Sequence, residues 1–121
     1  MSYFEAGCKP KQDWRIGTEH EKFSFTTADH KAVPYDGENG IEALLNGLRE
    51  DFNWEPLTDN GKLIGLKKPG QGSISLEPGG QFELSGAPLE SIHQTCAEVH
   101  THLDEVRSVG RKLGIGMLGL G

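Results

Sequence analysis

The sequence predicts an α+β protein, in which two helices pack on one face of an antiparallel sheet. Three observations support this fold class. Apolar residues recur at helical spacing over residues 40–51. A second apolar stripe runs through about residues 89–113, with alternating spacings of four and three. Between these helices, residues 63–85 hold short β-type segments separated by glycine-rich turns, as in an antiparallel meander.

The elements are expected in the following order along the chain. Residues 1–12 are irregular or form a short helix, and the first strand covers residues 13–27. Turn-forming residues make 28–39 a loop before the first main helix. The apolar face of that helix consists of Ile41, Leu44, Leu45 and Leu48.

The meander is expected to begin after the turn signal Asn60-Gly61. Its three strands are predicted over residues 63–67, 73–77 and 81–85. The intervening stretches PGQG and PGG are read as turns. The chain would therefore double back twice within a short distance and place neighbouring segments side by side.

The long helix over about residues 89–113 follows Pro88 and ends before the capping glycine Gly114. Its buried stripe is predicted to contain Ile92, Cys96, Val99, Leu103, Val106, Gly110 and Leu113. Cys96 is thus expected to be a buried thiol, whereas His93, His100 and His102 are expected at the surface or the helix edge. The final residues, from Ile115, read as another strand.

Composition narrows the class of protein. The 121 residues are enough for one domain, and the net charge of -6 argues against nucleic acid as a partner. Two cysteines in no CxxC pattern favour a reducing compartment. The N-terminal residues lack a signal-type apolar run, and the apolar C-terminal stretch is too short to span a bilayer. A cytoplasmic protein without a membrane partner is therefore predicted.

The stretch IGTEHEKFSF places two acids inside the first strand. Side chains two residues apart on a strand share a face, so Glu19 and Glu21 lie close together. Two ionised carboxylates at that separation need a nearby positive charge. A divalent cation would supply it, and so would a basic side chain such as Arg15 or Lys22.

A second acidic feature lies in SISLEPGGQFELS, residues 73–85. Alternation puts the apolar residues of both strands on one face, so Glu77, Gln81 and Glu83 project from the other. If the strands pair, Glu77 and Glu83 point into the same space. Together with Glu19 and Glu21 they would form a site for Mg²⁺, a hard cation that prefers oxygen ligands. The alternative is that these acids are solvated surface charges.

Several long motifs together resemble the glutamate–cysteine ligase family of the plant and proteobacterial type. They are RIGTEHEKFSF, PYDGENGIEALL, LEPGGQFELSGAPLESIHQTCAEVHTHL and GIGMLGLG. The resemblance covers almost the whole chain, from about residue 3 to residue 121. It implies a glutamine-synthetase-like fold in which a curved antiparallel sheet forms a funnel-shaped active site. It also implies that residues 1–121 are a single N-terminal fragment of a larger catalytic domain.

The activity implied by this resemblance is the first step of glutathione biosynthesis. ATP phosphorylates the γ-carboxylate of L-glutamate, and the amine of L-cysteine then attacks the γ-glutamyl phosphate. By motif position the resemblance makes Glu19, Glu21, Glu77 and Glu83 metal ligands for Mg²⁺. Gln81 is expected to contact the substrate or a metal-bound water. It also implies that Cys96 takes part in a redox-sensitive disulfide whose partner lies outside this chain.

The fragment itself is expected to be inactive and to self-associate through exposed sheet edges. Two alternatives remain open at this point. One is a non-catalytic fragment that binds a cation or a partner, and the other is a related carboxylate–amine ligase with a different acceptor amine.

Overall fold

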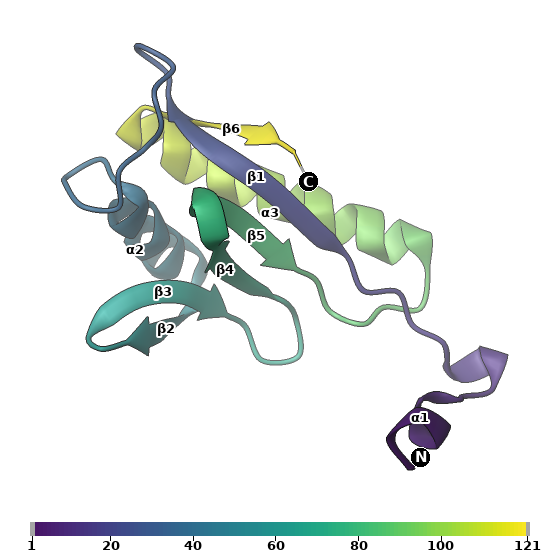
Figure 1. The fold of residues 1–121 in the computed structure, drawn as a ribbon. Coiled ribbons are helices and arrows are strands. Elements are labelled where there is room, and N and C mark those ends of the chain that lie inside the picture. The colour runs from purple at the N-terminus through teal and green to yellow at the C-terminus, as the bar shows by residue number, and fades with distance from the viewer. Residues whose placement is uncertain (1, 121) are drawn as a thin grey trace.

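The structure is a computed structural model that describes residues 2–120. Six strands form one sheet in the order β2-β3-β4-β5-β1-β6, and every neighbouring pair is antiparallel. The helices α2 and α3 lie against one face of this sheet (Figure 1). The predicted α+β class is therefore confirmed. The strands are β1 Glu19–Thr26, β2 Glu55–Asp59, β3 Lys62–Lys67, β4 Ser73–Glu77, β5 Gln81–Ser85 and β6 Ile115–Gly119.

The helices are α1 Ser2–Gly7, α2 Ile41–Phe52 and α3 Ile92–Leu113, with short 3₁₀ turns η1 Lys11–Asp13 and η2 Pro78–Gly80. Helix α2 matches its prediction, because the four predicted apolar residues all face the core. They pack against apolar side chains from the sheet and from α3, including Leu66, Phe82 and Val109. No described helix is long and apolar enough to cross a bilayer.

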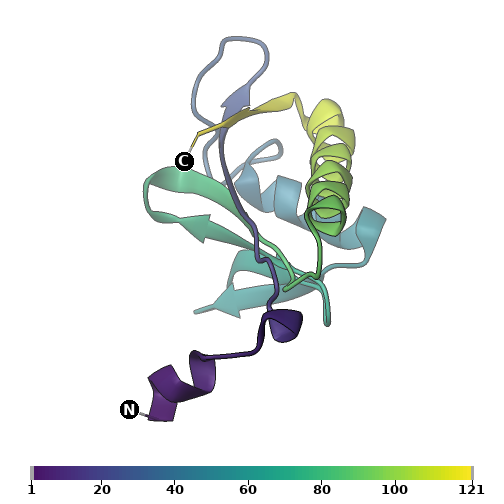
Figure 2. The same cartoon turned by 90° about the vertical axis from the view of Figure 1, so that its right-hand side faces the viewer.

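The first strand is shorter than predicted. It begins at Glu19, and the residues before it form only an isolated bridge between Ile16 and Leu89. Residues 2–18 instead lie to one side of the sheet and helices, as Figure 2 shows. Strand β1 then runs between β5 and β6, so it pairs with two segments that are far from it in the sequence (Figure 1).

Strand β2 was not predicted. The sequence EPLTD contains a proline and two acids and lacks a clear alternation of apolar residues. It pairs with β3 across the turn at Asn60 and Gly61, both of which have positive φ. That turn was predicted, since Asn-Gly readily adopts the left-handed conformation of a tight hairpin. β2 is an edge strand, which is where a proline is tolerated.

Helix α3 begins three residues later than predicted and is rotated about its axis. A capping box starts it: Ser91 Oγ accepts a hydrogen bond from Gln94 N, and Gln94 Oε1 accepts one from Ser91 N. The left-handed residue Gly114 ends it, as predicted. The buried face consists of Thr95, His102, Glu105, Val106, Val109 and Gly110.

Several predictions for α3 are therefore wrong. Ile92 is 64% exposed, and Cys96 is exposed rather than buried. His102, expected at the surface, is only 2% exposed. The reason is that α3 packs over the buried Lys22 of β1. Polar side chains of α3 therefore face the sheet at positions where hydrophobic periodicity predicts exposure to solvent.

Candidate metal and substrate site on the open face of the sheet

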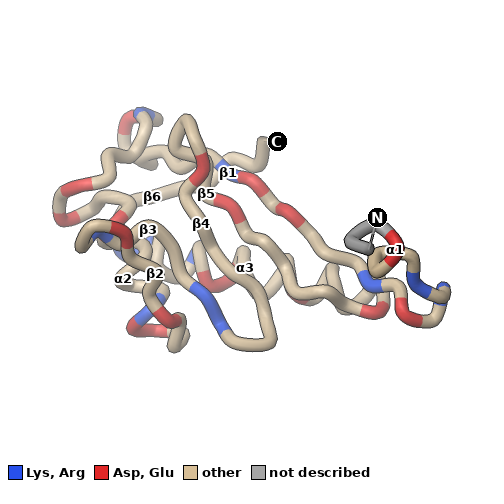
Figure 3. The backbone as a smooth tube through the Cα atoms, turned by 60° about the horizontal axis from the view of Figure 1, so that its bottom comes forward, with Lys and Arg blue, Asp and Glu red and all other residues tan. Residues whose placement is uncertain are grey.

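All five residues predicted for the site lie on the sheet face that points away from α2 and α3, here called the open face. Strand pairing establishes this placement, because directly opposed residues project to the same side of a sheet. Glu21 of β1 is opposite Glu83 of β5, and Glu77 of β4 is opposite Gln81 of β5. Glu19 is two residues before Glu21 on the same strand and therefore shares its face. The acidic segments of β1, β4 and β5 lie near one another in Figure 3.

Glu83 is the centre of this arrangement. Glu21 is its direct neighbour on one side, and Ser75 is its direct neighbour on the other. Glu19 is opposite Ser85 and Glu77 is opposite Gln81, each two residues from Glu83, so both acids are diagonal neighbours of Glu83. Directly opposed side chains have Cβ atoms about 5 Å apart, and diagonal ones about 7–8 Å. Three carboxylates thus surround that of Glu83 on a single sheet face.

Local hydrogen bonds hold two of these carboxylates. Ser85 Oγ donates to Glu83 Oε1 at 2.8 Å, and Ser75 Oγ donates to Glu77 Oε1 at 2.9 Å. The Glu83 residue is also only 8% exposed. The serines that alternate with the acids along β4 and β5 therefore orient the carboxylates, a role that the sequence analysis did not assign.

The donor set fits a hard divalent cation, because it offers carboxylate oxygens on a shared face. Within residues 2–120, however, no group of three or more acidic, histidine or cysteine side chains is arranged to hold a metal ion. One carboxylate oxygen of Glu77 and one of Glu83 instead accept hydrogen bonds from neighbouring serines. The structure therefore brings the predicted residues together on one surface without placing their oxygens around one point.

Neither basic residue considered as a counter-charge for Glu19 and Glu21 serves that role. Arg15 pairs with Glu90 at 3.6 Å. Lys22 projects from the other face of β1, beneath α3. A lysine that the sequence analysis did not single out, Lys67, lies opposite Ser73 on the open face. The predicted meander contained the signal for Lys67, because pairing the first two strands places it on the serine face.

The opposite face of the same strands carries a buried basic group made of Lys22, His20 and His102. Lys22 is 1% exposed, and its ammonium donates to the carbonyl oxygen of His20 at 2.9 Å and lies 3.2 Å from His20 Nδ1. It is also 5.7 Å from the centre of the Phe82 ring. Its long side chain therefore ends in a confined space between the sheet and α3.

Burial determines the ionisation of this basic group. It lowers the pKa of Lys22 to about 8, while the Glu83 carboxylate opposes the shift. Burial, reinforced by the charge of Lys22, lowers the pKa of His102 to about 3. The pKa of His20 is lowered for the same two reasons. His102 is consequently a neutral imidazole near pH 7. Lys22 is still charged at that pH, and the Glu83 carboxylate compensates only part of the cost of burying its ammonium group.

Comparisons with known proteins agree with the family resemblance that the sequence motifs indicate. The family model described as glutamate–cysteine ligase family 2 matches residues 15–121. Glutamate–cysteine ligase B, chloroplastic, of Oryza sativa subsp. japonica is 57% identical over the whole chain, which corresponds to 24% of that protein. The chloroplastic enzymes of Solanum lycopersicum and Arabidopsis thaliana are 56% and 55% identical, again over the whole chain and over 22% of each protein.

The fold is thus an antiparallel sheet with carboxylates grouped on its open face, and these matches identify the protein family. The chain belongs to glutamate–cysteine ligase family 2. It spans about a quarter of the length of the curated relatives that it matches. The prediction of a cytoplasmic protein is wrong, because these similar proteins are chloroplastic by name. Cysteine usage and the N-terminal residues could not distinguish the two compartments.

Proposed function

We propose that this chain is the N-terminal part of a glutamate–cysteine ligase of the plastid, which forms γ-glutamylcysteine for glutathione synthesis. Its membership of the ligase family supports the reaction class. The observation that carries the site is the grouping of Glu19, Glu21 and Glu77 around Glu83 on the open face. Carboxylates so close to one another are unfavourable without a cation, and ATP chemistry brings Mg²⁺.

In this proposal the four glutamates would hold Mg²⁺, which would supply positive charge beside the ATP phosphates. Ser75 and Ser85 keep Glu77 and Glu83 oriented until the metal arrives. Gln81 lies opposite Glu77 in the strand register, and in this proposal its amide binds glutamate beside the metal. Transfer of the γ-phosphoryl group activates the glutamate γ-carboxylate, and attack by the cysteine amine releases phosphate.

The chain alone is proposed to be inactive. Substrate carboxylates and phosphates require basic side chains, and Lys67 is a basic residue that β3 projects onto the open face. Two amino-acid substrates with carboxylate groups and a nucleotide need more positive charge than one lysine provides, and they need a site closed around them. We propose that the longer protein supplies both, in keeping with the quarter of the relatives' length that this chain spans.

The test assays ADP release with L-glutamate and L-cysteine, using the chain joined to its natural continuation. Glu21→Gln and Glu83→Gln are expected to lower activity about a hundredfold or more, and added Mg²⁺ should restore part of the loss by mass action. Glu50→Gln on the exposed side of α2 is the matched control and should retain full activity. Full activity in both site variants would refute the assignment of metal ligands.

A further inference from the structure

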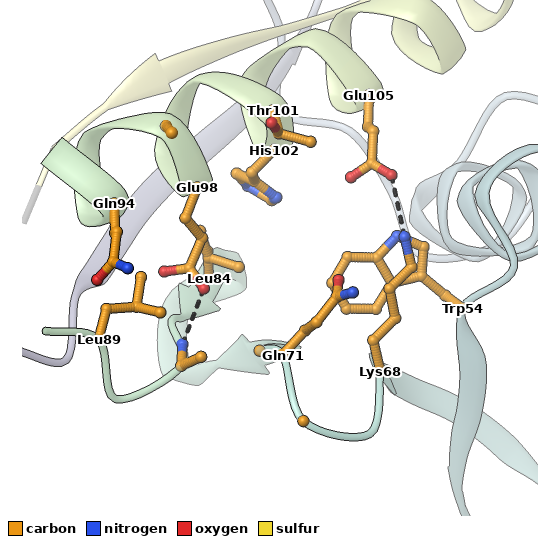
Figure 4. A pocket seen from close by; sticks show the side chains of 14 residues that line it. Trp54, Lys68, Gln71, Leu84, Leu89, Gln94, Glu98, Thr101, His102 and Glu105 are labelled. Carbon is orange, nitrogen blue, oxygen red and sulfur yellow. Dashed lines mark hydrogen bonds and ion pairs between the residues drawn. The ribbon is translucent and has the colours of Figure 1, made fainter.

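A pocket lies between α3 and the sheet, on the side opposite the open face. Its volume is about 380 Å³, within the size range of small-molecule sites. Figure 4 shows Glu98, His102 and Glu105 descending from α3 toward Trp54, Gln71 and Leu84. No part of the proposed ligase site uses these side chains.

The pocket contains buried polar atoms with no hydrogen-bond partner among the described residues. They are Trp54 Nε1, Glu98 Oε1 and both ring nitrogens of His102. Trp54 is 6% exposed and His102 is 2% exposed, so bulk solvent does not readily satisfy them. An unpaired buried polar atom is costly, because it has lost its hydrogen bonds to water without gaining others. Three such side chains around one cavity are the arrangement expected of a site that a polar ligand completes.

The charges around the pocket restrict the ligand. Lys68 and Glu105 neutralise each other through a 3.3 Å ion pair, and the Lys68 ammonium also lies 4.6 Å from the centre of the Trp54 ring. Within residues 2–120 no basic side chain pairs with Glu98: its Oε2 accepts a hydrogen bond from Ala87 N at 2.9 Å, which leaves its charge uncompensated. An anion would therefore meet a net negative wall.

Leu84, Ala87 and Leu89 form an apolar part of the wall, and Gln71, Gln94 and Thr101 add neutral polar side chains to it. We propose that this pocket binds a small amphipathic molecule with an apolar body and an N–H-donating head, either an amide or an ammonium group. The head donates to Glu98 and to a ring nitrogen of His102, and an amide oxygen accepts from Trp54 Nε1. This chemistry differs from that of anionic glutamate and ATP, so the site is independent of the proposed ligase site.

The test uses three probes with the same aromatic body: benzamide, benzylamine and benzoate. The ¹⁵N-labelled 121-residue chain is titrated, and the indole N–H resonance of Trp54 is followed. Trp14, which is exposed and lies ahead of β1, serves as an internal control in every spectrum. Benzamide and benzylamine should shift the Trp54 resonance saturably, with Kd on the order of a millimolar for ligands of this size. Benzoate should leave it unchanged.

Three variants make the result specific to the pocket. Ala97 lies on the exposed side of α3 at the pocket wall, so Ala97→Phe should fill the cavity and abolish the shifts without unfolding the helix. His93→Phe, on an exposed part of α3 outside the pocket, is the matched control and should bind normally. Glu98→Gln should weaken benzylamine about tenfold and leave benzamide binding nearly unchanged.

The proposal is overturned if no probe shifts Trp54, if benzoate binds as well as benzamide, or if Ala97→Phe binds like the parent chain. Ligase activity does not enter any of these measurements. Failure here therefore leaves the proposed ligase function intact, and loss of the ligase assignment leaves this result unaffected.

Discussion

Glu21 and Glu83 face each other across antiparallel neighbours on the open face of the sheet. Like charges directly opposed on paired strands are destabilising, so this pair opposes folding in the absence of a cation. The same relationship explains why the two residues are the natural pair for testing metal binding. It leads to a prediction in which stability and ligand binding change in opposite directions.

Glu21→Gln is predicted to raise the free energy of unfolding of the metal-free chain by about 0.5 kcal/mol, because it removes one of the opposed charges. The same change should weaken Mg²⁺ binding measured by calorimetry. Urea unfolding with EDTA and with Mg²⁺ separates the two effects. Glu50→Gln should change neither quantity, since Glu50 lies on the exposed side of α2. A destabilised metal-free Glu21→Gln chain would contradict the proposed repulsion.

Lys22 predicts a stability that increases with pH. Burial lowers its pKa to about 8 in the folded chain, against 10.5 for the free side chain. Between these values the unfolded chain binds more protons, so the free energy of unfolding increases as pH increases. From pH 8 to pH 9.5 the gain from this residue is on the order of 2 kcal/mol.

Lys22→Met should remove that increase and stabilise the chain at pH 7, because the buried charge is gone. Urea unfolding at pH 7, 8 and 9.5 measures the difference between the parent and the variant. Lys31→Met is the control, since the Lys31 side chain is 80% exposed. A parallel pH dependence of the parent and Lys22→Met would show that Lys22 ionises normally.

At Gly47 of α2, replacing glycine by alanine is expected to destabilise the chain, contrary to the usual helix propensities. Alanine at this position would place its Cβ against Val109 Cγ1 of α3, closer than van der Waals contact allows. Val109 is 2% exposed and β-branched, so it has little freedom to move. Gly47→Ala is therefore expected to destabilise the chain by about 1–3 kcal/mol, although this exchange usually stabilises a helix.

Thermal unfolding of Gly47→Ala, Val109→Ala and the double variant tests this contact. The two changes should be non-additive, with the double variant more stable than the sum predicts. Additive losses would mean that α2 and α3 can separate enough to admit the methyl group.

β6 predicts concentration-dependent self-association. It pairs with β1 and is the last strand of the sheet, and its exposed residues include Leu118, at 53%. The other edge, β2, carries Glu55, Pro56 and Asp59, which hinder pairing with a second chain. Light scattering should detect oligomers of the parent chain, and Leu118→Lys should reduce them. Ile64→Lys, at an exposed residue away from the β6 edge, should leave them unchanged.

The open face could be predicted because strand periodicity is simple. Alternation in residues 73–85 assigns each side chain to a face without any knowledge of the rest of the chain. The only further step was the pairing of β1 with β5, which follows no local rule. The resemblance to known ligases supplied the expectation that the two acidic segments meet, and the pairing of Glu21 with Glu83 agrees with it.

The back of the sheet could not be predicted in the same way. Lys22 and His102 are charged or polar residue types that are rarely buried, so their positions read as surface. They are buried here because both side chains pack against the Phe82 ring between the sheet and α3. Such a contact between distant segments depends on the tertiary structure. Because polar residues were assumed to be exposed, the predicted buried face of α3 was wrong and the pocket beside this helix was not predicted.

The position of β1 has a consequence for the order in which the chain assembles. Strands β2 to β5 join neighbours in the sequence through short loops, whereas Thr26 of β1 pairs with Ile115 of β6. Contacts between distant segments form late, because loop closure must be completed first. During synthesis on the ribosome, β1 emerges first yet waits for β6 before both its edges are occupied. Pulsed hydrogen exchange should accordingly show amides of β4 protected before those that link β1 to β6.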